Sequence, residues 1–330
     1  MKTIRWGIIG CGGIARKRTI PGMLMAENCE IVAVQDVKAE IAEEVKTEAK
    51  AKYALTSVDE LLALDEVDAV YIASPLFCHK EQVIASANAK KHVLCEKPLG
   101  INSDEIKEMM RACEENNIKF GTAFMARFHR YHQKVKEIVE SGILGELVSL
   151  KAQFSFEYPE LNVWRQDIKL AGGGGFMDVG THAIDILRFM SGLEPVEVVA
   201  ITGNQFYNYS VEDTSHLLAK MNNGAVMYVS SSYSTNAEPN RFEITGKKGA
   251  VYGNDTLSQT GFDARAYIKM VGEPEKTLEF EGEHVNMYTA ETSAFADAII
   301  KDTEVPVGAK EGLAAQLLIE AAYKSTTIKL

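Results

Sequence analysis

Short apolar runs alternate with amphipathic helical patterns along the first third of the chain. The runs that we predict as strands are Ile4–Ile9, Ile31–Gln35, Asp68–Ala73, Lys91–Cys95 and Ile118–Gly121. The predicted helices between them are Gly13–Ala26 (which Pro21 must kink or end early), Ala39–Lys52, one beginning after Ser57, His79–Ala89 and Ser103–Asn116. This alternation predicts a doubly wound parallel sheet of the Rossmann type.

The pattern changes near residue 124, where a helix at Phe128–Ser141 is followed by alternating apolar and polar positions. The predicted strands are Glu146–Glu157, Val196–Tyr207, Ser215–Met221, Ala225–Ser232, Arg241–Thr245 and Thr277–Glu281. We therefore expect a second α+β domain with an open, mainly antiparallel sheet. The expected domains are 1–123 and 124–330, with a last helix at about 309–325 packing back near the first domain.

Composition and charge narrow the class of protein. The chain has 330 residues and a net charge of −11, which argues against nucleic-acid or anionic-membrane binding. No apolar run is long enough to span a bilayer, and the N-terminus is strand-like rather than a signal peptide, so we expect a cytoplasmic protein. One apolar face of the second sheet would be exposed in a single copy, which predicts a homodimer or homotetramer formed through that sheet.

A glycine-rich turn follows the first predicted strand. The stretch Gly10-Cys11-Gly12-Gly13-Ile14-Ala15 fits the G-x-G-x-x-G/A pattern of a dinucleotide-binding turn. The residues that we expect to hold the cofactor diphosphate are Gly10, Gly12, Gly13 and Ile14. Small residues permit the tight turn and a close approach of the backbone, and the following helix start favours an anion.

An acidic residue ends the second predicted strand. Asp36 lies 23 residues after Gly13, close to the roughly 20 expected for the carboxylate that binds the adenosine ribose. A carboxylate there accepts hydrogen bonds from the ribose hydroxyls and repels a 2′-phosphate, which favours NAD over NADP. The nearby Lys38 would soften this repulsion. The alternative is a plain βαβ unit in which Asp36 caps a helix.

Lys97 is a candidate for the chemistry. In a parallel sheet the segments Gly10–Ala15, Ser74–His79 and Glu96–Pro98 converge at the carboxyl ends of the strands. An ammonium group there would hydrogen-bond a substrate hydroxyl and help it lose its proton. The alternative is a solvated lysine that pairs with Glu96.

Asp178 and His182 follow the glycine run Gly172–Gly175 and lie four residues apart, on one face of a helix. A carboxylate and an imidazole together suit general acid–base work. There are two alternatives. In one, Asp178 caps the helix and His182 is a buried structural residue; in the other, the pair binds a metal together with Asp185. We expect no metal, because no third strong ligand is evident at a suitable spacing. Further candidates are Arg127, Trp164, Arg165, His79, His129, His132 and Tyr288, for each of which a structural role competes.

With these motifs in view, the chain resembles the glucose-fructose oxidoreductase/inositol dehydrogenase (Gfo/Idh/MocA) family over nearly its whole length. The resemblance rests on the Gly10–Ala15 turn, Ala73-Ser74-Pro75 with His79, Glu96-Lys97-Pro98, and the glycine run followed by Asp178 and His182. It implies a Rossmann domain followed by an open α/β sheet.

The resemblance also implies roles for single residues. Lys97 would contact both substrate and nicotinamide, His182 would be the acid/base, and Asp178 would help to position the substrate. The other residues that it places near cofactor or substrate are Ser74, Pro75, His79, Glu96, Arg127, Trp164, Arg165 and Tyr288.

The leading hypothesis is an NAD(P)-dependent enzyme that transfers a hydride between nicotinamide and a carbinol or carbonyl carbon of a sugar, cyclitol or anhydro-sugar. One alternative is redox-neutral glycoside cleavage, in which tightly bound NAD oxidises a sugar hydroxyl transiently. A second alternative is a non-catalytic module that senses NAD, which the presence of both Lys97 and His182 disfavours.

Overall fold

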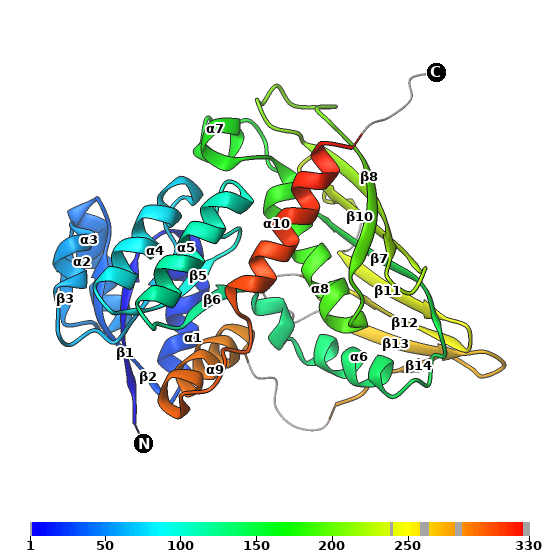
Figure 1. Cartoon of the computed structure of the whole chain (residues 1–330), viewed down its shortest axis with the longest axis horizontal. Helices are drawn as coiled ribbons and strands as arrows, with labels where there is room; N and C mark the ends of the chain where they lie inside the picture. The colour runs from blue at the N-terminus through cyan, green and yellow to red at the C-terminus, as the bar shows by residue number, and fades with distance from the viewer. Residues whose placement is uncertain (1, 238–239, 258–263, 281–285, 326–330) are drawn as a thin grey trace. The chain divides into compact units, whose positions relative to one another are not determined.

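The computed structural model describes residues 2–237, 240–257, 264–280 and 286–325. The chain divides into two compact units. In Figure 1 the colour follows the residue number, so the stretches of each unit can be found from the bar. The first unit is Met1–Met125 with Val285–Leu313, and the second is Ala126–His284 with Ala314–Leu330. Each unit is therefore assembled from two separate stretches of chain.

The first unit contains a six-stranded sheet in which all pairs of neighbouring strands are parallel. Its strands are β1 (Ile4–Ile9), β2 (Cys29–Gln35), β3 (Tyr53–Leu55), β4 (Ala69–Ile72), β5 (His92–Glu96) and β6 (Phe120–Ala123). Their order is β3-β2-β1-β4-β5-β6, the order of a dinucleotide-binding Rossmann sheet. The predicted doubly wound parallel sheet is confirmed.

Helices cover this sheet. They are the π-helical turn η1 (Ala15–Thr19), α1 (Ile20–Met25), α2 (Ala39–Ala49), α3 (Val58–Leu62), the 3₁₀ turn η2 (Leu76–Cys78), α4 (His79–Asn88), α5 (Ser103–Glu115) and α9 (Met287–Lys301). The chain is helical without a break from Gly13 to Met25, and the wider π-helical turn η1 lies just before Pro21, so the predicted helix forms and changes its winding next to the proline instead of ending there. The helix α3 begins directly after Ser57 as predicted, and the Ser57 hydroxyl accepts the Glu60 N–H and caps it.

The core of the first unit lies on both faces of its sheet. Trp6, Tyr71 and Leu94 belong to one apolar cluster, and Val70, Ile72 and Val93 belong to the other. The helix α9, which we did not predict from the sequence, packs against α1, and its Phe295 ring lies 5.7 Å from that of Trp6. Residues far along the chain thus complete the first core.

The second unit contains an eight-stranded sheet of order β14-β13-β12-β11-β7-β10-β9-β8. Its strands are β7 (Leu147–Ser155), β8 (Pro195–Gly203), β9 (Thr214–Met221), β10 (Val226–Ser232), β11 (Arg241–Gly246), β12 (Gly249–Asn254), β13 (Arg265–Met270) and β14 (Lys276–Thr277). Every pairing is antiparallel except that of β7 with β10, which confirms a mainly antiparallel sheet. We did not predict β12 and β13, and Glu281 of the predicted last strand lies outside the described residues.

Several short helical segments belong to the second unit, and Figure 1 shows α8 and α6 beside one face of its sheet. They are the 3₁₀ turn η3 (Met125–Phe128), α6 (Arg130–Glu140), the 3₁₀ turn η4 (Trp164–Gln166), α7 (Ile168–Ala171), the π-helical turn η5 (Phe176–Gly180) and α8 (Thr181–Ser191). All but one residue of α8 are buried, because it packs on β7, β10 and β11 while α6 covers its outer side. The last helix, α10 (Ala309–Tyr323), begins in the first unit and ends in the second.

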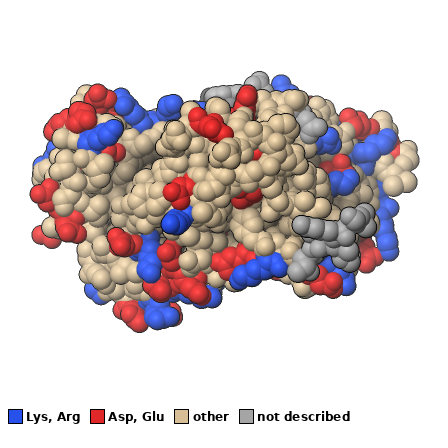
Figure 2. Space-filling view, turned by 90° about the horizontal axis from the view of Figure 1, so that it is seen from above, with Lys and Arg blue, Asp and Glu red and all other residues tan. Residues whose placement is uncertain are grey.

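Two surface properties bear on function. On the face seen in Figure 2, acidic and basic side chains are interspersed rather than segregated by sign. No helix in the described part of the chain is both long enough and apolar enough to cross a membrane.

Candidate active site

The glycine turn after β1 has the backbone that a diphosphate requires. Gly10 has a φ of +87°, and a Cβ there would lie 2.6 Å from the Ser74 nitrogen, so no larger residue fits this turn. A Cβ at Gly12 or Gly13 would meet no atom within 4 Å. The backbone at these two glycines therefore borders open space, as a cradle for a bound diphosphate must.

Asp36 lies directly beside this turn. One oxygen of its carboxylate accepts the Cys11 N–H at 3.1 Å, and the other accepts the Lys38 N–H at 3.0 Å. These two bonds fix the carboxylate at the carboxyl end of β2, and its remaining lone pairs are available to hydroxyl groups. The residues present thus fit the diphosphate and ribose of a dinucleotide, in the arrangement that the sequence predicts.

His79 joins the other two segments of the first unit. Its Nδ1 lies 3.1 Å from the Pro98 carbonyl oxygen, and its Nε2 lies 3.0 Å from the Ser74 carbonyl oxygen. The ring is 2% exposed. His79 therefore connects the loop after β4 with the loop after β5 from within the fold, and Ser74 in turn lies against Gly10.

Lys97 follows β5 and is half-buried. Its backbone N–H donates to the Glu96 carboxylate at 3.3 Å, and the same carboxylate accepts a short hydrogen bond from the Tyr71 hydroxyl. The Thr19 hydroxyl donates to Tyr71 at 2.8 Å. Burial, together with the charge of Glu96, raises the pKa of Tyr71 well above its usual value, so Tyr71 stays a donor. A buried chain of polar groups thus runs from η1 to the residue before Lys97.

Tyr288 lies in the first unit, at the start of α9. Its side chain is 2% exposed and packs against Gly22, where a Cβ would lie 2.8 Å from that of Tyr288. Burial raises its pKa, as do the nearby charges of Glu96 and Glu291. Its predicted contact with substrate stays a prediction.

In the second unit, Asp178 belongs to a polar and aromatic cluster. Its carboxylate accepts the Tyr233 hydroxyl at 2.9 Å and lies 4.0 Å from the Arg165 Nε. The Arg165 guanidinium stacks over the Trp164 ring at 4.4 Å. Three of the predicted substrate residues are therefore together, and Tyr233, which the sequence analysis missed, joins them. Its only sequence sign is its place directly after a predicted strand.

The helix that carries Asp178 and His182 is capped by another carboxylate. Glu212 accepts the Gly174 N–H at 2.9 Å and the Phe176 N–H at 3.0 Å, and it also accepts the Tyr323 hydroxyl at 2.8 Å. Asp178 lies inside the helical segment and does not cap it. No spacing in the sequence indicated Glu212.

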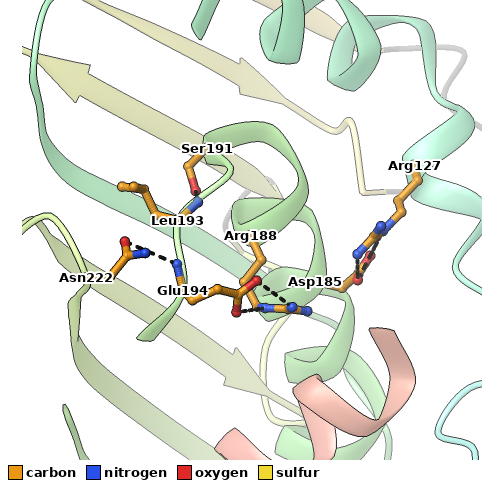
Figure 3. A network of polar contacts seen from close by, with 7 residues as sticks. All are labelled: Arg127, Asp185, Arg188, Ser191, Leu193, Glu194 and Asn222. Carbon is orange, nitrogen blue, oxygen red and sulfur yellow. Dashed lines mark hydrogen bonds and ion pairs between the residues drawn. The ribbon is translucent and has the colours of Figure 1, made fainter. Parts of the chain in front are cut away.

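His182 is the second residue of α8 and is 5% exposed. Two ion pairs hold this helix, as Figure 3 shows. Buried Arg127 binds both oxygens of the Asp185 carboxylate at 2.6–3.1 Å, and Arg188 binds Glu194 at 2.8 Å. Arg127 thus holds α8, and its predicted place at the cofactor stays a prediction. Among the described residues, no group of three or more His, Cys, Asp or Glu side chains is arranged to hold a metal.

A Rossmann sheet with an open glycine turn, and with a carboxylate beside that turn at the end of β2, defines the first unit as a dinucleotide-binding domain of the kind found in oxidoreductases. The comparisons with known proteins agree. Residues 4–124 match the oxidoreductase family with an NAD-binding Rossmann fold, and residues 132–252 match the GFO/IDH/MocA C-terminal domain. The chain belongs to the Gfo/Idh/MocA family of oxidoreductases.

Relatives and solved structures match nearly end to end. A 1,5-anhydro-D-fructose reductase of Ensifer adhaerens is 31% identical over 89% of this chain and 88% of its own. A D-xylose 1-dehydrogenase (NADP(+)) of Haloferax volcanii is 31% identical over 97% and 96%. An aldose-aldose oxidoreductase from Caulobacter crescentus, solved with glycerol, is 25% identical with a TM-score of 0.92 and covers both chains completely.

Proposed function

We propose that the protein is a dehydrogenase or reductase that exchanges a hydride between a nicotinamide cofactor, NAD in preference to NADP, and a carbinol or carbonyl carbon of a sugar, cyclitol or anhydro-sugar. The observation that carries the proposal is the convergence, within the first unit, of the open turn at Gly12, the Asp36 carboxylate and Lys97 at the carboxyl edge of one parallel sheet. The sugar-related activities named for the two relatives support the substrate class.

The proposed roles follow from the chemistry of each side chain. When bound, the nicotinamide supplies the hydride exchange. The Lys97 ammonium donates a hydrogen bond to the reacting oxygen and polarises it, and His182 takes or returns the proton of that oxygen. Asp178, held by Tyr233 and Arg165, accepts a further substrate hydroxyl and orients the ring. The Trp164 face offers an apolar surface to the carbon side of a sugar.

Cofactor choice is proposed from Asp36 alone. Its carboxylate is fixed by two backbone N–H groups, so it cannot swing away from a 2′-phosphate without breaking both bonds. That favours NAD, even though one relative is named for NADP.

The outer face of the second sheet supports a proposed homodimer or homotetramer. Val199, Leu218 and Tyr228 are directly paired across three neighbouring strands, and Ile201 is 67% exposed on the same face. An apolar face of this kind is commonly covered by a second copy of the chain.

The test is a panel of polyols, aldoses and keto-sugars with NAD(H) and NADP(H), followed by the absorbance of the reduced nicotinamide. On the best substrate, Lys97→Ala and His182→Ala should each lower kcat by about 10²–10⁴-fold, the usual contribution of acid–base groups. Binding of NADH, measured by its fluorescence, should stay within a few fold. Wild-type turnover in both variants would remove the proposed mechanism.

A further inference from the structure

Glu212 stands out among the buried charged groups that the proposed mechanism does not use. It is 8% exposed and lies just before β9, on the chain segment that also contains Asp213. Its carboxylate makes the three bonds described above, to two backbone N–H groups and one hydroxyl. Its own carbonyl oxygen also accepts the Gly175 N–H at 3.2 Å. One residue therefore receives the N–H groups of three consecutive residues of the chain, from Gly174 to Phe176.

The glycine run is shaped around this residue. A Cβ at Gly174 would clash with the backbone of Glu212, and a Cβ at Gly173 would clash with the hydroxyl of Tyr323. Gly173 and Gly174 therefore allow other residues of the same chain to approach their backbone closely. The backbone at Gly12 and Gly13 in the first unit, in contrast, borders open space. The carboxylate also lies at the positive end of the helical segment that begins at Phe176, which favours its negative charge.

The contacts of Glu212 lead directly to the proposed acid–base residues. Phe176, whose N–H it receives, is two residues before Asp178 and begins the turn η5 that continues into α8 and His182. The neighbouring Asp213 carbonyl accepts the Tyr233 N–H at 2.8 Å, and Tyr233 binds the Asp178 carboxylate. Glu212 therefore holds the backbone that leads into Asp178, and the backbone carbonyl of Asp213 holds the residue that orients the Asp178 side chain.

We propose that Glu212 is a positioning residue, which fixes the turn η5 so that Asp178 and His182 keep the orientation that turnover requires. This inference rests on the proposed function of Asp178 and His182. Glu212 does not touch the reacting atoms. Each of its two carboxylate oxygens receives one backbone N–H, whereas a carboxamide would present an oxygen to one of these N–H groups and its own NH2 donor to the other.

Asp213 provides a matched control. Its carboxylate also receives backbone N–H groups, those of Gln205, Phe206 and Tyr207, and these hold a different loop. Asp213→Asn therefore removes the same kind of interaction from the adjacent residue, while its backbone bond to Tyr233 remains. Tyr323→Phe is a milder change in the Glu212 contacts, because it deletes one hydroxyl and keeps both backbone bonds.

The experiment compares Glu212→Gln, Tyr323→Phe and Asp213→Asn in the full chain, on the best substrate of the panel. We expect Glu212→Gln to lower kcat by up to about 10²-fold, the effect of a misplacement of about 1 Å at a reacting centre. NADH binding should stay at the wild-type value, and amide hydrogen exchange should rise across Gly174–Gly180. Tyr323→Phe should cause a smaller loss in the same direction, and Asp213→Asn should leave kcat within about twofold.

Two results would overturn the inference. One is wild-type kcat in Glu212→Gln, and the other is an equal loss of kcat in Glu212→Gln and Asp213→Asn, which would mean a general effect on folding. If Glu212→Gln does not fold, Glu212→Asp decides, because its shorter side chain keeps the charge but withdraws the carboxylate from both N–H groups, and unchanged exchange and kcat there would contradict the proposal. Failure of the wild-type protein to turn over any substrate would count against the proposed function, whereas unchanged exchange in Glu212→Gln would count against the role of Glu212.

Discussion

At the scale of single residues, burial determines which groups can change charge. His132 is fully buried, its Nδ1 donates to the Ala126 carbonyl at 2.7 Å, and its ring meets that of Phe242 edge to face. Burial lowers the pKa of His132 from 6.5 to about 4. The imidazole is therefore neutral in the folded protein over a range in which the unfolded chain would already be protonated.

This difference predicts a loss of stability on acidification. Because the folded pKa is depressed, the unfolded state binds the proton first as the pH falls below 6.5, and the free energy of unfolding should drop by up to roughly 3 kcal/mol before pH 4. His132→Asn keeps a donor for the Ala126 carbonyl and does not titrate. Urea denaturation at a series of pH values should show a flatter profile for this variant than for the wild-type protein, and equal slopes would contradict the assignment.

At the scale of an element, two glycines of the turn after β1 have different roles. Gly10 needs its positive φ and its close contact with Ser74, so it serves the fold. Gly12 has no positive φ and borders open space, which leaves its backbone accessible to the proposed ligand. The two residues belong to one motif, yet only the structure distinguishes their roles.

Alanine at these two positions should give opposite results. Gly10→Ala should lower the thermal midpoint, by an amount that corresponds to at least about 1–3 kcal/mol, because a side chain is strained in that conformation. Gly12→Ala should leave the midpoint unchanged and weaken NADH binding by about tenfold or more, because its methyl group occupies space that the diphosphate needs. A fluorescence titration and a melting curve on each variant test both statements. Unchanged NADH affinity in a folded Gly12→Ala would contradict the assigned cradle.

At the scale of the whole molecule, the outer face of the eight-stranded sheet carries exposed apolar side chains. Half-buried Tyr228 pairs with exposed Leu218, which in turn pairs with exposed Val199. This row gives the proposed oligomer a definite surface. Charged side chains such as Lys151 and Glu243 pair with each other further across the same sheet.

A charge placed in this row should break the oligomer. Leu218→Asp would bury a carboxylate in the apolar interface, so we expect a shift to monomers in size-exclusion chromatography with light scattering. Met25→Asp introduces the same charge at an exposed apolar position of the first unit and serves as the control. A wild-type protein that is already monomeric, or a Leu218→Asp variant of unchanged mass, would count against the sheet as the interface.

Much of the fold was predictable because its causes are local. Alternating apolar runs and helical patterns predicted the parallel sheet, and the glycine turn with Asp36 predicted the dinucleotide site, since strand periodicity and turn chemistry act over a few residues. The short strands β12 and β13 escaped prediction because a six-residue strand that begins or ends with polar residues has a weak pattern, and pairing with its neighbours makes it a strand.

The sequence alone therefore determined the fold class, the cofactor turn and the family to which the chain belongs. The tertiary structure decided which side chains support the candidate site. Glu212 lies 38 residues from Gly174 and Tyr233 lies 55 residues from Asp178, while Arg127 reaches Asp185 across 58 residues. No spacing rule connects such pairs, because they meet only when separate strands and helices pack against one another.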